Sequence, residues 1–402
     1  MAPSSMWLRL LLAVSLIWSS VVAAPEGVYS TSDIKNGKAL IALHNKALAN
    51  VKARMAKSRG CSCNSKTLKV RQEWRTLSAP QKKNFIEAVK CVRAKPSLYP
   101  PGVVPGSKSL YDDFVAVHLN QTLFIHLTGT FLLWHRWYIQ EYENRLHACG
   151  YTGVLPYWEW GLDVNDVTKS PIFDGSPTSL GGNGAYIPHP GLMMPQPIPP
   201  TIISTPPGTG SGCVTTGPFG NLTMRLGPAS MPNYGNTNST AAADPMADNY
   251  RCLRRDLNTA VLARYSNFYN STTLVLNSRD VGQFQGMMQG DPRLVTGELG
   301  VHGGGHFTIG GDPGSDPFIS PGDPAFWLHH GQVDRLYWIW QNLDWADRQN
   351  VMGTAVFMDL FPSANVTVND KIDMTPLSPP IAIKDIMSTT GGKPLCYIYQ
   401  PY

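Results

Sequence analysis

The placement of the histidines constrains this chain more than any other feature of its sequence. Most of them lie in two short stretches that are dense with aromatic and aliphatic residues. The two stretches hold, in chain order, His118, His126, His135 and then His302, His306, His329, His330. An imidazole among apolar side chains must find a partner, and histidine is the commonest protein ligand for metal ions. The sequence therefore predicts metal binding by segments that lie far apart along the chain.

The other histidines, His44, His147 and His189, stand in polar or turn contexts. We expect these three to be structural or surface residues. His135, taken alone, would also be interpreted as a hydrogen-bonded core residue. It is the grouping into two sets that indicates a metal.

Helical periodicity places both sets on or beside predicted helices. Apolar residues recur at spacings of three and four in four segments, residues 67–94, 109–126, 131–148 and 324–343. Ser78 and Pro80 resemble a helix start, and Asp323–Pro324 is the expected N-cap and first turn of the last segment. Residues 165–246 are rich in Pro, Gly, Ser and Asn, which favours long irregular loops. We predict one domain whose two helical halves meet at a shared site.

His302 and His306 are four residues apart, so on a helix both imidazoles project from one face and can share a metal. The three residues between them are all glycine, and each weakens a helix by up to about 1 kcal/mol. Such a cost is expected where the backbone passes close to a bulky ligand or a second metal, or in a plain turn. Gly303 stands where a zinc peptidase of this spacing has its catalytic glutamate, so a peptidase would lack its general base.

Ligand chemistry narrows the choice of metal. Di-iron carboxylate sites need Glu-x-x-His pairs, and both histidine clusters are almost free of carboxylates. Blue-copper sites need a cysteine and usually a methionine, which the clusters lack. Zinc accepts three imidazoles, but two such triplets supply no bridging carboxylate. Imidazole-only coordination that serves two oxidation states fits two copper ions.

The first residues predict export. Residues 1–23 combine the basic Arg9, an apolar run and small residues, which is typical of a secretory signal peptide cleaved after Ala23. No later segment offers about 18 uninterrupted apolar residues, so we expect no membrane anchor. A secreted, extracellular protein also fits the Asn-x-Ser/Thr glycosylation acceptors, which are Asn120, Asn221, Asn238, Asn270 and Asn365.

Cysteine count and charge limit the remaining properties. Seven cysteines in an oxidising compartment indicate up to three disulfides and one leftover thiol, in pairs that the sequence does not reveal. The net charge is +5 and no basic cluster is interleaved with aromatics, so nucleic acid is not an expected partner. The oligomeric state is not indicated by the sequence.

The histidine clusters and their flanks resemble one known family. The matching stretches are "FLLWHR", "LPYWEWG" at 155–161, "HGGGH" and "DPAFWLHHGQVDR", with "RQEWR" and "YIY" nearer the ends. From about residue 70 onward the chain resembles the type-3 dicopper tyrosinases and catechol oxidases, close to their short secreted fungal members. The resemblance implies a mainly α fold, in which a four-helix bundle houses a dicopper centre surrounded by long irregular loops. It also implies one catalytic domain over residues 24–402, without a C-terminal shielding domain.

The resemblance also implies the ligands. Copper A would be held by His118, His126 and His135, and copper B by His302, His306 and His330. His329 points about 100° away on a helix and would be structural, although a shift in register would exchange it with His330. Asp334 shares one helical face with His330 and is expected to support that face.

The implied reaction is the oxidation of a small ortho-diphenol to an ortho-quinone by dioxygen. Phe326 matches the family's aromatic residue over copper A and is expected to stack on the substrate ring, if it is not ordinary core. Glu298 precedes His302 by four residues and matches a glutamate that holds a water near copper B as general base. The plainer interpretation of Glu298 is a charge that favours the dipole of a short helix.

Two departures from the family pattern refine these expectations. Family members that hydroxylate monophenols well often have Asn where this chain has Gly303, and Phe307 keeps the other side apolar. We therefore expect diphenol oxidation, with weaker hydroxylation of monophenols. Many relatives also crosslink a cysteine to the second copper A histidine, whereas the residues here are Phe124 and Ile125, so His126 is expected to be less rigidly held.

Other functions stay open. The chain could be an efficient tyrosinase or an oxidase dedicated to an aminophenol or another single phenolic metabolite. An oxygen carrier of the haemocyanin type would use the same centre but bind dioxygen without oxidising a phenol. A zinc hydrolase would differ in its metal content.

Overall fold

The computed structural model describes residues 28–57, 62–197, 200–229 and 241–402. The predicted signal peptide, Asn238 and Cys61 lie outside these residues. Within them the protein is mainly helical, as predicted. None of the described helices combines the length and the apolar character needed to cross a membrane.

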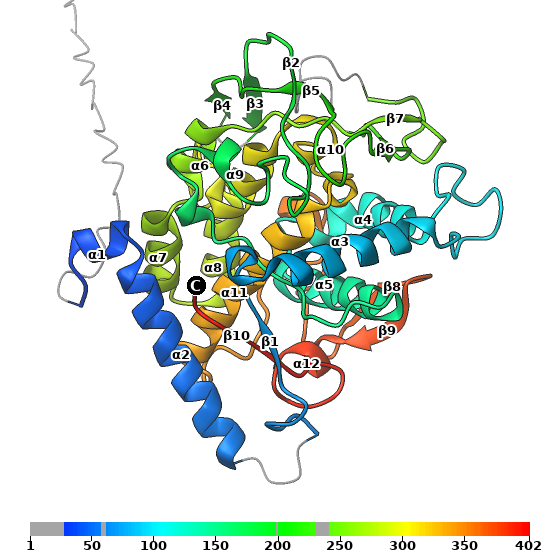
Figure 1. The fold of residues 1–402 in the computed structure, drawn as a ribbon. Helices are drawn as coiled ribbons and strands as arrows, with labels where there is room; N and C mark the ends of the chain where they lie inside the picture. The colour runs from blue at the N-terminus through cyan, green and yellow to red at the C-terminus, as the bar shows by residue number, and fades with distance from the viewer. Residues whose placement is uncertain (1–27, 58–61, 198–199, 230–240) are drawn as a thin grey trace, which may run out of the picture.

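Four helices form the centre of the molecule. The first half of the chain supplies α4 (Leu110–Ile125) and α5 (Phe131–Ala148), and the second half supplies α9 (Gly300–Ile309) and α11 (Ala325–Leu343). Helix α5 contacts both α4 and α11, and α11 contacts α9, so the two halves lie side by side (Figure 1). The predicted meeting of two helical halves is confirmed.

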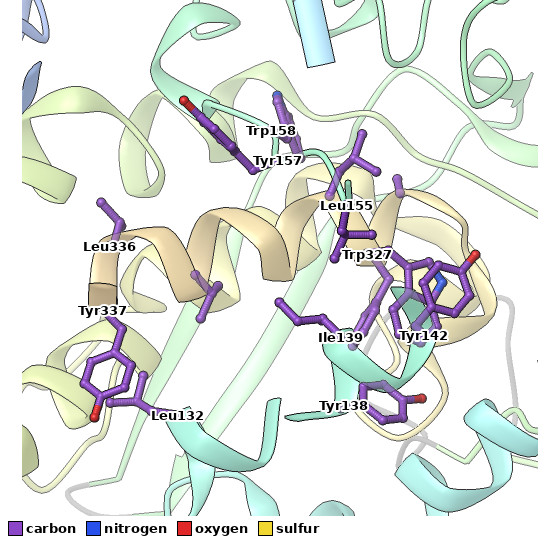
Figure 2. Packing of buried hydrophobic residues seen from close by; sticks show 14 of the residues in the cluster. Leu132, Tyr138, Ile139, Tyr142, Leu155, Tyr157, Trp158, Trp327, Leu336 and Tyr337 are labelled. Atoms are coloured by element: carbon purple, nitrogen blue, oxygen red, sulfur yellow. The ribbon is translucent and has the colours of Figure 1, made fainter. Parts of the chain in front are cut away.

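Helix α11 is central and is buried along nearly its whole length. It is surrounded by α2 (Lys38–Lys57), α5, α7 (Phe268–Asn277) and α9. On the side facing α5, the rings of Trp327 and Tyr142 lie almost parallel, with their centroids 3.6 Å apart (Figure 2). Because every face of α11 is covered, its polar side chains must find partners inside the protein.

Local capping explains where two of the predicted helices begin. Ser78 forms a capping box at the start of α3 (Ala79–Ala94), with proline in the first turn, as predicted. At the start of α11, the carboxylate of Asp323 accepts a hydrogen bond from the backbone N–H of Ala325 at 2.8 Å. Pro324 itself is the N-cap, so the expected cap is displaced by one residue but the capping carboxylate is correct.

The helix prediction for residues 67–94 is wrong in its first part. Lys69–Arg71 form strand β1, which pairs in parallel with β10 (Tyr397–Tyr399), and Trp74–Thr76 form a 3-10 turn. Pairing with a distant strand overrides the local helical periodicity, which only a tertiary contact could have revealed.

Residues 165–246 contain more regular structure than the irregular loops predicted. Antiparallel pairs form between β2 (Gly184–Tyr186) and β5 (Ser211–Val214), β3 (Leu192–Pro197) and β4 (Pro200–Thr205), and β6 (Thr223–Met224) and β7 (Arg251–Cys252). Strands this short, interrupted by Pro and Gly, leave no readable alternation in the sequence.

The remaining described elements support the four central helices. They are α1 (Thr31–Lys35), α6 (Thr259–Tyr265), α8 (Val281–Gln289), α10 (Gly311–Gly314), α12 (Ile383–Ile386), strands β8 (Lys371–Met374) and β9 (Ser378–Ala382), and 3-10 turns at Trp160–Leu162, Val167–Lys169, Ser320–Gly322 and Phe357–Asp359. Helices α6 and α8 both contact α9.

Three disulfides tie these elements together, as the cysteine count predicted. The pairs are Cys63–Cys396, Cys91–Cys149 and Cys213–Cys252. The first joins the segment before β1 to the segment before β10, and the second joins α3 to the end of α5. The strand pair β1–β10 is therefore fixed covalently beside the central helices.

Candidate metal centre

The two histidine clusters, far apart in sequence, face each other in the core. The rings of His135 and His330 lie nearly parallel, with centroids 4.5 Å apart. The rings of His126 and His302 are also stacked, at 5.8 Å. The shared site predicted from the sequence is thus formed where α4 and α5 meet α9 and α11.

The first set consists of His118 on α4, His126 directly after α4, and His135 on α5. In each ring Nδ1 lies within hydrogen-bonding distance of a backbone carbonyl, and a carbonyl only accepts, so Nδ1 carries the proton. These contacts run to Phe318, Thr122 and Phe131, at 2.8, 3.0 and 2.8 Å respectively. Such a contact leaves Nε2 as a lone-pair donor, the arrangement that orients a metal-ligating histidine.

Unpaired nitrogens show that the first set fits a cation. Among the described residues, the buried Nε2 atoms of His118 and His135 have no hydrogen-bond partner. The ring nitrogens of the three residues gather within 4.8 Å of one another. Buried polar atoms are normally satisfied, so orphaned lone pairs that converge indicate a missing ligand.

The second set consists of His302 and His306 on α9 and His330 on α11. The Nε2 atom of His306 lies 3.0 Å from Nε2 of His302 and 3.2 Å from Nε2 of His330. Three imidazole nitrogens in such close contact cannot all satisfy one another, because each neutral ring has only one N–H donor. A shared metal ion would satisfy all three at once.

His329 shares this group but faces differently. Its ring lies 5.2 Å from that of Trp160 and against Gly305 on α9. Within the described part of the chain, neither of its buried ring nitrogens has a hydrogen-bond partner. The contacts between Nε2 atoms run through His330 and not through His329.

Neighbouring side chains require two of the three glycines between His302 and His306 on α9. A Cβ on Gly305 would lie 2.2 Å from Cε1 of His329, and one on Gly304 would lie 2.4 Å from Cβ of Tyr265. A Cβ on Gly303 would only touch Cβ of Leu299, at 3.3 Å. Packing of α6 and α11 onto α9 explains Gly304 and Gly305, and the alternative of a plain turn is wrong because all three glycines lie inside a helix. The expected close approach to a ligand or second metal stays a prediction.

Burial keeps all seven imidazoles neutral. It lowers the pKa of His126 to about 4 and that of His329 to about 3. Burial, followed by the neighbouring imidazoles, lowers the pKa of the other rings as well, which are His118, His135, His302, His306 and His330. Neutral imidazoles are the form that coordinates metals. Neither group of potential ligands in the described residues contains a carboxylate or a cysteine.

One edge of the centre is slightly open. His126, His302 and His306 are 9%, 7% and 8% exposed, whereas the other members of the two sets are 2% exposed or less. Gly303 and Phe307 directly follow His302 and His306 on α9 and are half-buried, and Phe307 packs against the apolar cluster that includes Tyr265 and Leu299. These three histidine rings are the members of the two sets that lie nearest to solvent.

Phe326 and Glu298 lie in different surroundings. Phe326 is only 1% exposed, and its ring stacks on that of His330 at 4.1 Å and lies 5.7 Å from that of His118. The side chain of Glu298 is 44% exposed and its carboxylate is 3.8 Å from the guanidinium of Arg264. Burial raises the pKa of Glu298, and Arg264 opposes this rise.

Asp334 supports the centre indirectly. Its carboxylate accepts hydrogen bonds from Arg136 Nε at 2.7 Å, Tyr397 Oη at 2.6 Å and Tyr399 Oη at 2.7 Å. Arg136 follows His135 directly on α5, so this buried ion pair fixes α5 to α11 beside the histidine rings. The arginine could have been inferred from its place beside a ligand, whereas the tyrosines could not.

The three isolated histidines are structural, as predicted. Nε2 of His44 contacts the carbonyl of Tyr399 at 3.1 Å, and Nε2 of His147 contacts that of Gly153 at 2.9 Å. His189 lies 3.1 Å from the carboxylate of Asp256.

Comparison with known proteins agrees with this geometry. A family model described as the common central domain of tyrosinase matches residues 108–343. "Tyrosinase P" of Aspergillus terreus is 40% identical over 335 residues, which are 82% of this chain and 91% of that relative. "N-acetyl-6-hydroxytryptophan oxidase ivoB" of Emericella nidulans is 35% identical over 354 residues, 84% of this chain and 94% of that relative. The solved structure of a polyphenol oxidase variant from Thermothelomyces thermophila has a TM-score of 0.85 at 40% identity, covering 92% of this chain and 100% of that one.

Proposed function

Because this chain belongs to the tyrosinase family of copper oxidoreductases, whose type-3 centre holds two copper ions, we propose that it is a secreted polyphenol oxidase that converts ortho-diphenols to ortho-quinones with dioxygen. The observation that carries the proposal is the pair of facing imidazole sets, buried and without a carboxylate in the described residues. Imidazole-only sites of this kind suit copper in both of its common oxidation states.

The ligands of the two ions are part of this proposal. Copper A takes His118, His126 and His135, and copper B takes His302, His306 and His330. The Nδ1 contacts of the first set and the Nε2 contacts of the second support the assignment. When bound, the copper pair supplies dioxygen binding and the two-electron redox chemistry.

The balance of the reaction defines what the protein must provide. Each diphenol loses two electrons and two protons to become a quinone, and two diphenols reduce one dioxygen to two waters. The chain must therefore hold a phenol ring at the open edge near His126, His302 and His306, and keep bulk water out. Gly303, which directly follows His302 and meets only Leu299, leaves space for the ring on α9.

Glu298 is the proposed general base for the phenolic proton. Burial raises its pKa above the usual range of a glutamate, which favours a carboxyl group that can take up a proton. The contact with Arg264 keeps it at the N-terminal side of α9.

For Phe326 the burial favours a positioning role over the predicted stacking on substrate. A ring that is 1% exposed and covered by His118 and His330 has no free face for a phenol in this structure. Its stacking instead fixes the plane of the His330 imidazole.

The absence of a side chain at Gly303 leads us to propose that diphenols are oxidised faster than monophenols. Without a side chain it cannot pair with Glu298 to fix a water, so hydroxylation of monophenols would be weak. A second candidate, an oxidase dedicated to one phenolic metabolite, is favoured by the relative that is named for oxidising N-acetyl-6-hydroxytryptophan.

The test uses the copper-loaded enzyme and two matched substrates. We expect quinone absorbance and oxygen uptake with hydroxytyrosol, and a much slower reaction with its monophenol, tyrosol. Equal rates would indicate an efficient tyrosinase, and reversible oxygen binding without quinone would indicate a carrier. Turnover of hydroxylated tryptophan derivatives but not of hydroxytyrosol would favour the dedicated oxidase. Metal analysis separates all of these from a zinc hydrolase.

Export is proposed from residues 1–23, with a single catalytic domain over 24–402. Three acceptor asparagines lie exposed, Asn120, Asn221 and Asn365, and are the expected glycan sites. Asn270 is half-buried and its amide nitrogen donates to the carbonyls of Arg264 and Tyr265, so we expect it unmodified. Mass mapping of secreted protein would locate the glycans.

A further inference from the structure

His126 is held by a backbone junction and not by a helix. It follows α4 with φ −118° and ψ 141°, outside the helical region. The next residue, Leu127, has φ +50°, a left-handed conformation that costs a non-glycine residue energy. The neighbouring Phe124 and Ile125 contain no sulfur, so no covalent bond to the ring can form from them. Something else must keep this strained junction in place.

Gln289 is the side chain in contact with that junction. Its Oε1 accepts a hydrogen bond from the backbone N–H of Leu127 at 2.8 Å. Its Nε2 donates to the carbonyl of Gln285, one turn earlier on α8, at 3.0 Å. The second bond fixes the amide orientation, so the acceptor oxygen is presented to Leu127. Gln289 thus joins the end of α8 to the peptide that follows His126.

The other side of the junction is fixed by the loop at residues 351–359. The N–H of Met358 donates to the carbonyl of Leu127 at 3.2 Å, and the N–H of Gly129 donates to that of Thr354 at 2.7 Å. Gln285 on α8 donates to the carbonyl of Met352 at 2.6 Å, which ties the loop to the same helix. Helix α8 and this loop therefore both form hydrogen bonds to the residues that follow His126.

A cavity of about 500 Å³ lies between α8 and this loop, but its lining is committed to structure. Asp291 and Asp359 both pair with Arg293, and Gln283 accepts from the N–H of Arg279. These polar groups form ion pairs and hydrogen bonds within the protein, which leaves few donors or acceptors for a ligand. We therefore interpret the cavity as a gap between α8 and the loop at residues 351–359, and not as a binding site.

We propose that Gln289 is a positioning residue for copper A, which keeps His126 directed at the metal through the Leu127 peptide. It takes the place of the covalent crosslink that the sequence of this chain excludes. The inference rests on the proposed assignment of His126 as a copper ligand. The expectation that His126 is less rigidly held is thereby modified, because a hydrogen bond replaces the missing covalent bond.

The test removes the hydrogen-bond acceptor of Gln289 but keeps a side chain of similar size at that position. Gln289→Met keeps the length of the side chain but leaves the N–H of Leu127 without its partner. Gln283→Met is the matched control. Gln283 is also a half-buried glutamine on α8, and its side chain accepts a hydrogen bond from the backbone N–H of Arg279, so the substitution removes a similar bond without affecting Leu127. Thermal unfolding of both variants checks that each folds.

Copper retention is the readout, and it does not depend on turnover. Under one chelator concentration, Gln289→Met should lose its first copper about tenfold faster than the wild type, whereas Gln283→Met should stay within about twofold. Chains left with a single cupric ion should give an electron paramagnetic resonance signal that a coupled pair does not. Equal copper loss from the two variants would overturn the proposal. Gln289→Glu retains an acceptor oxygen and should restore slow loss; fast loss from it would also count against the hydrogen bond.

One further variant separates this inference from the proposed function. If His126→Ala still holds two coppers per chain, the ligand assignment itself is wrong. If His126→Ala loses copper while Gln289→Met behaves like Gln283→Met, the assignment stands and only the role of Gln289 is rejected.

Discussion

At the scale of single residues, ring nitrogens decide what the centre can hold. In the first set each Nδ1 is used by a backbone carbonyl, which settles the orientation of all three rings. In the second set the choice lies between adjacent histidines, and only His330 brings Nε2 to His306 at 3.2 Å. His329 instead fills a gap between Trp160 and α9.

Removing one histidine of the pair should therefore have a different effect from removing the other. We expect His330→Ala to bind no more than one copper per chain and to lose oxidase activity. His329→Asn should keep two coppers, because no Nε2 contact to His306 is lost. Metal analysis of the purified variants tests this, and the reverse result would show that the register of the ligand is His329.

The glycines of α9 give a second matched pair. Gly305→Ala places a methyl group on the His329 ring, so we expect it to lower the free energy of unfolding by about 1–3 kcal/mol. Gly303→Ala meets only Leu299 and should be neutral or stabilising by up to about 1 kcal/mol, since alanine favours the helix. Denaturant unfolding of both variants measures the difference; equal losses would contradict the packing argument.

Sequence alone could predict the two histidine clusters but not the groups that support them. The structure brings the predicted residues of each cluster together, and the spacing of His302 and His306 along a helix indicated that these two act together. The carbonyl of Phe318, which orients His118, carries no side-chain signal because any residue supplies a carbonyl. Gln289 likewise lies in an ordinary helical segment, and its contact with Leu127 exists only in the folded chain.

At the scale of elements, helices with local signals were predictable and paired strands were not. The predicted segments 131–148 and 324–343 agree with α5 and α11 to within one residue, because their apolar periodicity is a local signal. Strand β1 was taken as helix because its conformation is imposed by β10, which a short window of sequence does not contain.

The ion pair between Arg136 on α5 and Asp334 on α11 links the two halves directly. Both side chains are essentially buried. Burial opposes ionisation of Asp334, but the guanidiniums of Arg136 and Arg71 more than offset it and hold its pKa below the usual range. The ionised form of Asp334 therefore contributes stability that is fully present above about pH 4 and is lost as the pH falls through the lower folded pKa.

Asp334→Asn should weaken this link strongly. At pH 7 we expect the free energy of unfolding to fall by about 3–5 kcal/mol, because the buried guanidinium of Arg136 loses its carboxylate and that of Arg71 keeps only Glu143. The variant should also show a flatter dependence of stability on pH below about pH 4. Asp248→Asn removes a partly exposed ion pair with Arg225 and should cost less than about 1 kcal/mol. Similar decreases in the free energy of unfolding of the two variants would show that the buried ion pair contributes no more stability than the exposed one.

At the scale of the whole molecule, disulfides close loops of very different length. Cys63–Cys396 spans 333 residues, whereas Cys213–Cys252 spans 39. The longer loop restricts the unfolded chain more, and it also holds β10, whose tyrosines bond to Asp334.

Replacing each of these cysteine pairs by serines should have unequal effects. On chain entropy alone, loss of Cys63–Cys396 should destabilise the protein by about 2 kcal/mol more than loss of Cys213–Cys252. Unfolding in guanidinium chloride, compared between the two double variants, measures the difference. A larger effect of the shorter loop would indicate that local strand pairing matters more than loop length.

The parallel pairing of β1 with β10 can form only late in the synthesis of the chain, because β10 lies close to its C-terminus. The hydrogen bond from Arg71 to Tyr399 spans 328 residues of chain, so it can form only after that tyrosine has left the ribosome, whereas Glu143, another partner of Arg71, is synthesised much earlier. At about 5–20 residues per second this wait lasts roughly 16–66 s. The β1–β10 pair and the hydrogen bonds from its tyrosines to Asp334 on α11 can therefore form only after residues 397–399 have been translated.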